Sequence, residues 1–91
     1  MLFEWDSRKA ASNLEKHGIS FEEASTVFGD SFSLTISDSG HSDAEDRFIL
    51  LGQSYRAKLL VVVFTERGEN IRIVSAWPAG RRERKTYEEN I

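Results

Sequence analysis

The chain has 91 residues, of which 40% are hydrophobic and 30% are charged, and its formal net charge is −3. It contains no cysteine, which excludes disulfides, thiolate metal sites and a cysteine nucleophile. The length suits one domain over residues 1–91 with a single core. No stretch reaches the roughly 18 apolar residues needed to span a bilayer, so we expect a soluble, cytoplasmic protein with no membrane contact.

The N-terminal residues predict a short strand and a first helix. Residues 2–5 alternate weakly, as a strand does. Asp6 is placed to cap a helix over residues 7–17, and Gly18 supplies the left-handed residue that ends it. The stripe of this helix that we expect to face the core comprises Ala10, Leu14 and His17.

A capping box predicts the start of a second helix. The Ser20 hydroxyl can accept from the backbone amide of Glu23, and the Glu23 carboxylate can reach back to the amide of Ser20. Apolar residues follow on one face up to about Phe28. Gly29 then ends the helix.

Four strands are predicted after the second helix. Residues 32–37 alternate between apolar and polar side chains, and residues 47–51 form the next strand. Residues 59–64 are apolar without alternation, which is typical of a central strand covered on both faces. A turn of about six residues, 65–70, leads to residues 71–77, and it is too short for anything but an antiparallel neighbour.

A charged helix is expected from Gly80 onward, with Tyr87 as its main apolar contact. The predicted order is therefore β-α-α-β-β-β-β-α. This is an α+β fold with a small antiparallel sheet, two N-terminal helices and one C-terminal helix.

The basic residues concentrate in the second half of the chain. Residues 1–46 carry three Lys or Arg against ten Asp or Glu, whereas residues 47–91 carry nine against five. The overall charge argues against a general nucleic-acid binder, but this distribution permits a local surface for one. The alternative is that the charges only decorate solvated faces.

The predicted strand over residues 71–77 carries one candidate phosphate ligand. On a regular strand Arg72 lies on one face, beside small side chains that leave room for a ligand, and Trp77 lies on the other. Arg67, at the adjoining turn, can reach the same end of the sheet. Two guanidiniums can grip a phosphate bidentately. The alternative for each arginine is a surface ion pair with a nearby carboxylate.

Two aromatic residues near the C-terminus each have two interpretations. Trp77 can stack on a base of single-stranded RNA, or it can pack under the last helix. The same choice applies to Tyr87. In the last helix Arg81 and Lys85 share a face and are the better pair for RNA, whereas Glu83 lies on another face and can pair with a strand arginine.

The two histidines differ in setting. His17 suits a capping or packing role at the last turn of the first helix. His41 lies in an acidic loop, where an imidazole can act as general acid or base, or can simply be solvated. The acidic residues around it match no metal-binding loop, and no phosphate-binding, nucleophile or dinucleotide motif is present. We expect no metal and no cofactor.

Short motifs along nearly the full length of the chain carry a family resemblance. They are Phe3-Glu4-Trp5-Asp6 with Lys9 and Asn13, Lys16-His17-Gly18, Phe21-x-Glu23-Ala24-x-x-Val27-Phe28, Asp38 with His41-Ser42, Glu45-x-Arg47, Gly52, Thr65-x-Arg67, Ile71-Arg72-Ile73-Val74-Ser75-Ala76, Arg82-Glu83 and Tyr87-Glu88. In this order they make the chain resemble the BrnT family of bacterial toxins from type II toxin-antitoxin modules.

The resemblance implies a RelE-like fold and a ribonuclease that arrests growth, with the active site on the basic face of the sheet and the last helix. It implies a BrnA antitoxin as partner, similar to ribbon-helix-helix DNA-binding proteins. Toxin and antitoxin then form a hetero-oligomer that represses its own promoter, and the toxin reaches DNA only through the antitoxin. Family members often have Arg directly after the Ser-Ala pair, where this chain has Trp77, so we expect activity that is weaker or is carried by Arg72 and Arg81.

Cleavage of RNA by attack of a ribose 2′-hydroxyl on its own phosphate needs a base, an acid and stabilisation of the phosphorane. We expect a metal-independent endoribonuclease of this kind. The expected catalytic residues are Arg67, Arg72 and Arg81 for the phosphate, and Glu83 or His41 for the protons. The expected RNA-binding residues are Arg47, Trp77, Arg82, Lys85 and Tyr87. The alternatives are a non-catalytic binding protein and an inactivated toxin that acts as a corepressor.

Overall fold

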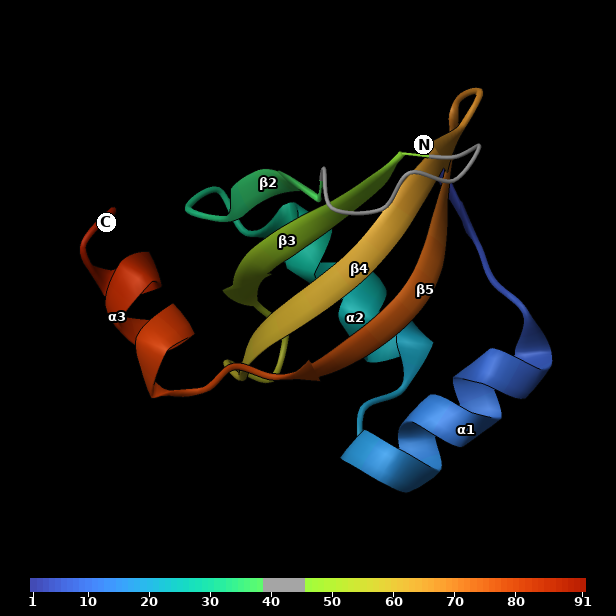
Figure 1. The fold of residues 1–91 in the computed structure, drawn as a ribbon, viewed down its shortest axis with the longest axis horizontal. Helices are drawn as coiled ribbons and strands as arrows, with labels where there is room; N and C mark the ends of the chain where they lie inside the picture. The colour runs from blue at the N-terminus through green and yellow to red at the C-terminus, as the bar shows by residue number, and fades with distance from the viewer. Residues whose placement is uncertain (39–45) are drawn as a thin grey trace.

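The computed structural model describes residues 1–38 and 46–91, and its elements follow the predicted order (Figure 1). The strands β1 to β5 span Leu2–Glu4, Leu34–Asp38, Arg47–Gln53, Leu59–Arg67 and Asn70–Pro78. The helices are α1 (Ser7–His17), α2 (Phe21–Thr26), a single 3-10 turn η1 (Val27–Gly29) and α3 (Arg81–Glu88). None of these described helices is long and apolar enough to cross a membrane.

The ends of α1 and the start of α2 are formed as predicted. The Asp6 side chain accepts from the backbone amides of Arg8 and Lys9 at 2.8 and 3.2 Å. Gly18 has φ 71°, the left-handed region that favours glycine. The Ser20 hydroxyl accepts from the amide of Glu23 at 3.0 Å.

The second half of the predicted capping box is wrong. Glu23 is only 5% exposed, and its Oε2 accepts from the hydroxyl of Ser54 at 2.8 Å. The carboxylate therefore ties α2 to the segment after β3. A long-range partner has replaced the local one that the sequence pattern predicted.

The buried side of α1 also differs from the prediction. Leu14 is 51% exposed and His17 is exposed, whereas Asn13 is 6% exposed. The Asn13 Nδ2 donates to the carbonyls of Ile19 and Ala76 at 2.9 and 2.8 Å, and its Oδ1 accepts from the amide of Ala76 at 3.0 Å. The helix therefore turns a polar residue inward, because that residue completes backbone hydrogen bonds of β5.

The five described strands form one sheet in the order β1-β5-β4-β3-β2. The strand pairs β2–β3, β3–β4 and β4–β5 are antiparallel, as predicted. Strand β1 runs parallel to β5, so the sheet is mixed. Strand β4 is central and mostly buried, as its continuous apolar run predicted. The turn after it contains only Gly68 and Glu69, not the predicted six residues, and Gly68 has φ 59°.

Strand β5 contains one extra residue. Val63 of β4 pairs with Ser75, and the next residue, Phe64, pairs with Ile73. Val74 therefore has no partner in β4 and forms a β-bulge.

The bulge reverses the alternation of side chains beyond it. Ile71, Ile73 and Ala76 all belong to the main core, whereas Trp77 packs with a second cluster on the opposite side of the sheet. Arg72, which alternates with Ile71 and Ile73, points to that same opposite side. The prediction that Arg72 and Trp77 lie on different faces is therefore wrong.

The two faces of the sheet are covered unequally. In Figure 1, α2 lies behind the sheet and α1 beyond its β5 edge, and both pack over the main core. On the other side α3 covers one end, where Tyr87 joins Leu51, Leu59 and Val61. We call the remainder of that side the open face, since no described helix crosses it. The open face includes Arg47, Ile49, Val63, Thr65, Arg72 and Trp77, together with Ile36 opposite Ile49 and Ser75 opposite Val63.

Candidate functional site

A row of five residues, one from each strand, crosses the sheet near the β4–β5 turn, and it begins with Asp38 of β2 opposite Arg47 of β3. In the strand register Arg47 pairs with Thr65, Thr65 with Arg72, and Arg72 with Glu4. Residues directly opposite one another share a face, so the side chains from Arg47 to Glu4 along this row lie together. Arg47 and Arg72 therefore flank the Thr65 hydroxyl. Their backbones are two strand spacings apart, or roughly 10 Å.

The edge of this row holds an ion pair. Arg72 Nη1 donates to Glu4 Oε2 at 2.8 Å, and Asn70 Nδ2 donates to Glu4 Oε1 at 3.2 Å. The bonds from Arg72 and Asn70 hold the pKa of Glu4 below its ordinary value, and the charge of Arg67 acts in the same direction. Arg67 follows Thr65 by two residues on β4, so it lies on the same face as the row and next to it.

Arg72 remains accessible despite its partner. Its side chain is 31% exposed and that of Glu4 is 33% exposed. The surface ion pair that the sequence left open as an alternative is therefore present. The bond to Glu4 uses one of the five N–H donors of the Arg72 guanidinium. The remaining donors can bind a further anion.

The hydroxyl between the two arginines is buried without a partner. Thr65 is 3% exposed, and its Oγ1 has no hydrogen bond among the described residues. Burying an unbonded hydroxyl costs about 1–3 kcal/mol by mutational measures. Such groups are uncommon in folded proteins and are often explained by a functional role. The sequence motif contained Thr65 but offered no role for it.

Trp77 lies on the same face, toward the α3 end. It is partly buried against the cluster of Leu51, Leu59 and Val61, and its ring centroid lies 6.1 Å from that of His17 at an interplanar angle of 45°. The two interpretations of Trp77 are therefore compatible, because one side of the ring packs while part of it stays exposed.

The predicted residues of α3 lie at the far end of the sheet from Arg72. Arg72 is opposite Thr65, whereas β5 ends at Pro78 opposite Leu60. Five residues of a strand separate these positions, a distance of about 17 Å. The structure therefore does not gather Arg81 with Arg67 and Arg72 around one phosphate. The exposed cations of α3 include Arg81, Arg82 and Lys85.

Glu83 and Tyr87 have structural contacts that differ from the roles predicted for them. Glu83 Oε1 accepts from the backbone amide of Gly80 at 2.7 Å and so caps its own helix. Tyr87 is 4% exposed, and its hydroxyl donates to Asp30 Oδ2 at 2.6 Å. Burial and this bond raise the pKa of Tyr87 to about 12. A buried ring offers no stacking face, so the prediction that Tyr87 binds RNA is not supported.

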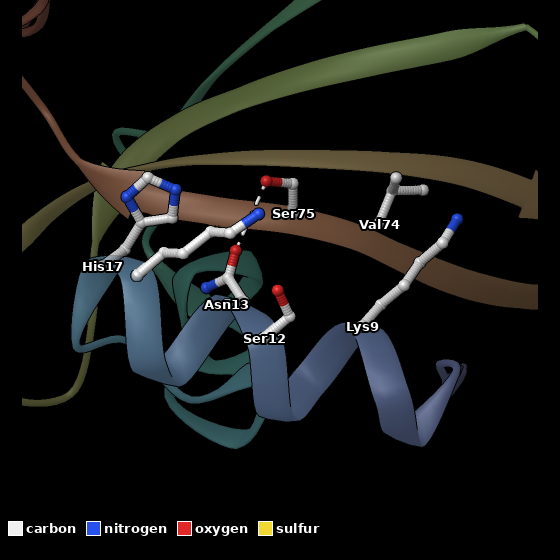
Figure 2. A pocket seen from close by; sticks show the side chains of 7 residues that line it. Lys9, Ser12, Asn13, His17, Val74 and Ser75 are labelled. Atoms are coloured by element: carbon white, nitrogen blue, oxygen red, sulfur yellow. Dashed lines mark hydrogen bonds between the residues drawn. The ribbon is translucent and has the colours of Figure 1, made fainter.

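The remaining candidate, His41, lies outside the described residues. His17, to which the sequence assigned capping or packing, contacts the Trp77 ring and also lines a cavity between α1 and β5 together with Lys9 and Lys16 (Figure 2). No local pattern signals this cavity, because its two walls are about 60 residues apart in the chain. Glu4 was likewise missed, since a strand carboxylate has no spacing that marks it.

Comparisons with known proteins identify a family and a similar fold. The model of a family described as the ribonuclease toxin BrnT of type II toxin-antitoxin systems matches residues 5–83. The chain is also similar to the crystal structure of the Brucella abortus ribonuclease toxin BrnT, with a TM-score of 0.67 and 21% identity, over 89% of this chain and 100% of that one. At this identity the likeness concerns the fold. No curated protein matches the sequence.

Proposed function

Because the chain belongs to the BrnT family of ribonuclease toxins from type II toxin-antitoxin systems, we propose that it cleaves RNA on the open face without a metal ion. Residues 1–91 act as one domain in the bacterial cytoplasm. The RNA strand runs along β5, from the row at Arg72 toward Trp77 and α3.

The observation that carries this proposal is the position of Thr65 between Arg47 and Arg72. A buried hydroxyl with no partner gains a hydrogen bond when an acceptor arrives, and the two flanking guanidiniums favour an anionic one. A phosphate satisfies both requirements. Because Thr65 is 3% exposed, the proposal requires the side chains around its hydroxyl to move aside when the phosphate binds.

The proposed reaction is an in-line transfer within the RNA. The 2′-oxygen forms a bond to the adjacent phosphorus, and the bond from phosphorus to the 5′-oxygen breaks. A base takes the 2′-hydroxyl proton and an acid supplies one to the leaving 5′-oxygen. The products are a 2′,3′-cyclic phosphate and a 5′-hydroxyl. Arg47, Arg67 and Arg72 stabilise the charge that develops on the phosphorane.

Glu4 is a positioning residue in this proposal. Its lowered pKa makes it a weak proton acceptor at neutral pH, since an efficient general base has a pKa near the working pH. Its bond to Nη1 instead orients the Arg72 guanidinium toward the open face. His41 keeps the predicted role of proton carrier.

Binding along the rest of the face uses two further features. The exposed part of Trp77 stacks on a base, which tolerates any sequence because every base has a π-face. The exposed cations Arg81, Arg82 and Lys85 hold phosphates beyond it. In this arrangement α3 binds the strand and takes no part in the chemistry.

A type II toxin has an antitoxin partner. We take this partner to be a BrnA-like ribbon-helix-helix protein that neutralises the toxin. The complex represses its own promoter, with DNA contacted through the antitoxin.

The test is cleavage of a defined single-stranded RNA by protein freed of its partner, with analysis of the product ends. Arg72→Ala should lower the rate about 100-fold or more, Arg72→Lys should restore part of it, and Arg56→Ala, an exposed arginine away from the row, should leave it unchanged. Activity of Arg72→Ala equal to that of the wild type would place the site elsewhere. Intact RNA that is bound with a steep salt dependence would instead identify a non-catalytic binding protein.

A further inference from the structure

A cavity of about 200 Å³ lies between α1 and the part of β5 that β1 does not cover. Figure 2 shows Lys9 and His17 rising from α1 on either side of the contact between Asn13 and Ser75. Lys16 also lines it. The cavity is separate from the row at Arg72, although it borders the same strand.

The lining of this cavity suits an anion. Lys9 and Lys16 carry positive charge, the His17 imidazole adds a ring N–H, and Ser12 offers a hydroxyl donor, whereas the Ser75 hydroxyl already donates to Asn13 Oδ1. None of the described lining residues is acidic. Residues 1–46 contain ten acidic residues and only three Lys or Arg. Two of these three basic residues line this cavity.

The floor of the cavity is rigid. Asn13 is buried, and its amide is fully engaged with the backbone of Ala76 and Ile19 and with the Ser75 hydroxyl at 3.3 Å. These bonds fix α1 against β5 and so fix the positions from which Lys9 and Lys16 extend. A preorganised set of donors loses less entropy on binding than a flexible one.

We propose that this α1–β5 cavity is a second phosphate-binding site for the RNA strand, in which Lys9, Lys16 and His17 hold a phosphate next to the one at Arg72. The proposal rests on the proposed function, because it assigns a further contact to the same substrate. This second site binds the RNA and fixes its position along β5, since no reacting atom lies in the cavity.

The position of the cavity favours RNA over an acidic protein segment. Ser75 in its wall is three residues from Arg72 along β5, or about 10 Å. The His17 ring neighbours Trp77, which lies on the open face. The cavity therefore continues the surface assigned to the strand, and its volume suits one compact charged group better than an extended peptide.

The test uses a single-stranded RNA with 2′-O-methyl groups, which cannot be cleaved, and measures its affinity at several salt concentrations. The double variant Lys9→Gln/Lys16→Gln is compared with Arg8→Gln/Lys58→Gln, which removes the same charge from exposed positions that do not line the cavity. We expect the first variant alone to lose affinity several-fold, and its plot of log affinity against log salt to be less steep by about 0.7, the value for one lost phosphate contact on a single strand. The NMR signals of the His17 ring should shift on adding this RNA to the wild type.

Three results would overturn the proposal. If the wild type binds and cleaves RNA and both double variants bind RNA as tightly as the wild type does, the second site is wrong while the proposed function stands. If the Lys9/Lys16 variant keeps its RNA affinity and loses affinity for the antitoxin, the cavity is a protein-docking site. If the wild type neither binds nor cleaves RNA, the proposed function itself fails.

Discussion

Arg72 and Trp77 lie on the same face of the sheet, although five positions separate them in one strand and a regular strand would place them on opposite faces. The bulge at Val74 inserts the extra residue that aligns them. A guanidinium and an aromatic ring on one surface provide the two contacts that single-stranded RNA needs, one for a phosphate and one for a base. The bulge therefore brings both groups of the proposed RNA-binding surface to the open face.

Trp77→Ala should weaken binding of single-stranded RNA. One stacked base contributes about 1–3 kcal/mol, so we expect affinity to fall about tenfold or more. Trp77→Phe keeps an aromatic face and should retain most of the affinity. Fluorescence anisotropy with a labelled 2′-O-methyl RNA measures both, after circular dichroism has shown that the variants are folded. Equal affinity for Trp77→Ala and the wild type would mean that the ring only packs.

Thr65→Val should separate stability from activity. The buried hydroxyl of Thr65 has no described partner, so replacing it with a methyl group should leave the free energy of unfolding unchanged or raise it by about 1 kcal/mol. RNA cleavage should fall, because the phosphate loses a donor. Urea denaturation and the cleavage assay test the two parts, and Thr65→Ser, which keeps the hydroxyl, is the control. A destabilised Thr65→Val would show that the hydroxyl already has a partner.

Asn13→Ala should destabilise the fold by about 3 kcal/mol. It removes the side chain that pairs with both backbone groups of Ala76 and leaves buried groups unbonded. Leu14→Ala, on the neighbouring residue, should change stability by no more than about 0.5 kcal/mol because Leu14 is 51% exposed. The urea midpoints of the two variants, at unchanged m-values, provide the comparison. If Leu14→Ala lost more stability than Asn13→Ala, the sequence prediction that Leu14 faces the core would be right.

Tyr87→Phe should destabilise the protein by about 2 kcal/mol, since it removes a bond to a charged acceptor. It should also change the pH dependence of stability. Folded Tyr87 keeps its proton up to a pKa of about 12, whereas an unfolded tyrosine loses it near pH 10. The unfolded state binds fewer protons in that interval, so the free energy of unfolding should fall as pH rises through it.

Asp30, the partner of Tyr87, has the opposite effect on the pH dependence of stability. Burial raises the pKa of Asp30, but hydrogen bonds from Gln53, Tyr87 and Phe32 outweigh it and lower the pKa below its ordinary value. The stability due to Asp30 is present above the unfolded pKa of about 3.9 and is lost as pH falls below it. Thermal melts across both intervals should show the alkaline loss in the wild type and in Tyr55→Phe, an exposed tyrosine, but not in Tyr87→Phe.

Gly52→Ala should destabilise the fold by about 1–3 kcal/mol through overpacking. A Cβ at this position would lie 2.9 Å from Ser33 Cβ and 2.9 Å from Val27 Cγ1. Gly29→Ala is the matched control, because a Cβ there meets nothing within 4 Å. Its stability should lie between that of the wild type and about 1 kcal/mol above it. Melting temperatures that fall equally in both variants would contradict the packing argument.

Signals that act within a few residues predicted the elements of this fold correctly. Asp6 and Gly18 set the ends of α1, Ser20 begins α2, and the continuous apolar run places β4 in the centre of the sheet. Caps and periodicity act through neighbouring backbone groups, so they are readable without the rest of the chain. The resemblance of the ordered motifs to the BrnT family was confirmed by the match over residues 5–83.

The sequence by itself thus determined the α+β class, the order of its elements, the central strand and the basic character of the C-terminal half. Only the tertiary structure decided that Asn13 and not Leu14 is buried, that Glu23 bonds to Ser54, and that Val74 bulges so that Trp77 joins Arg72. Each of these outcomes depends on a partner that lies far away in the chain or on another strand. A side chain takes the partner that satisfies buried polar groups or fits the strand register, and that partner exists only after the chain has folded.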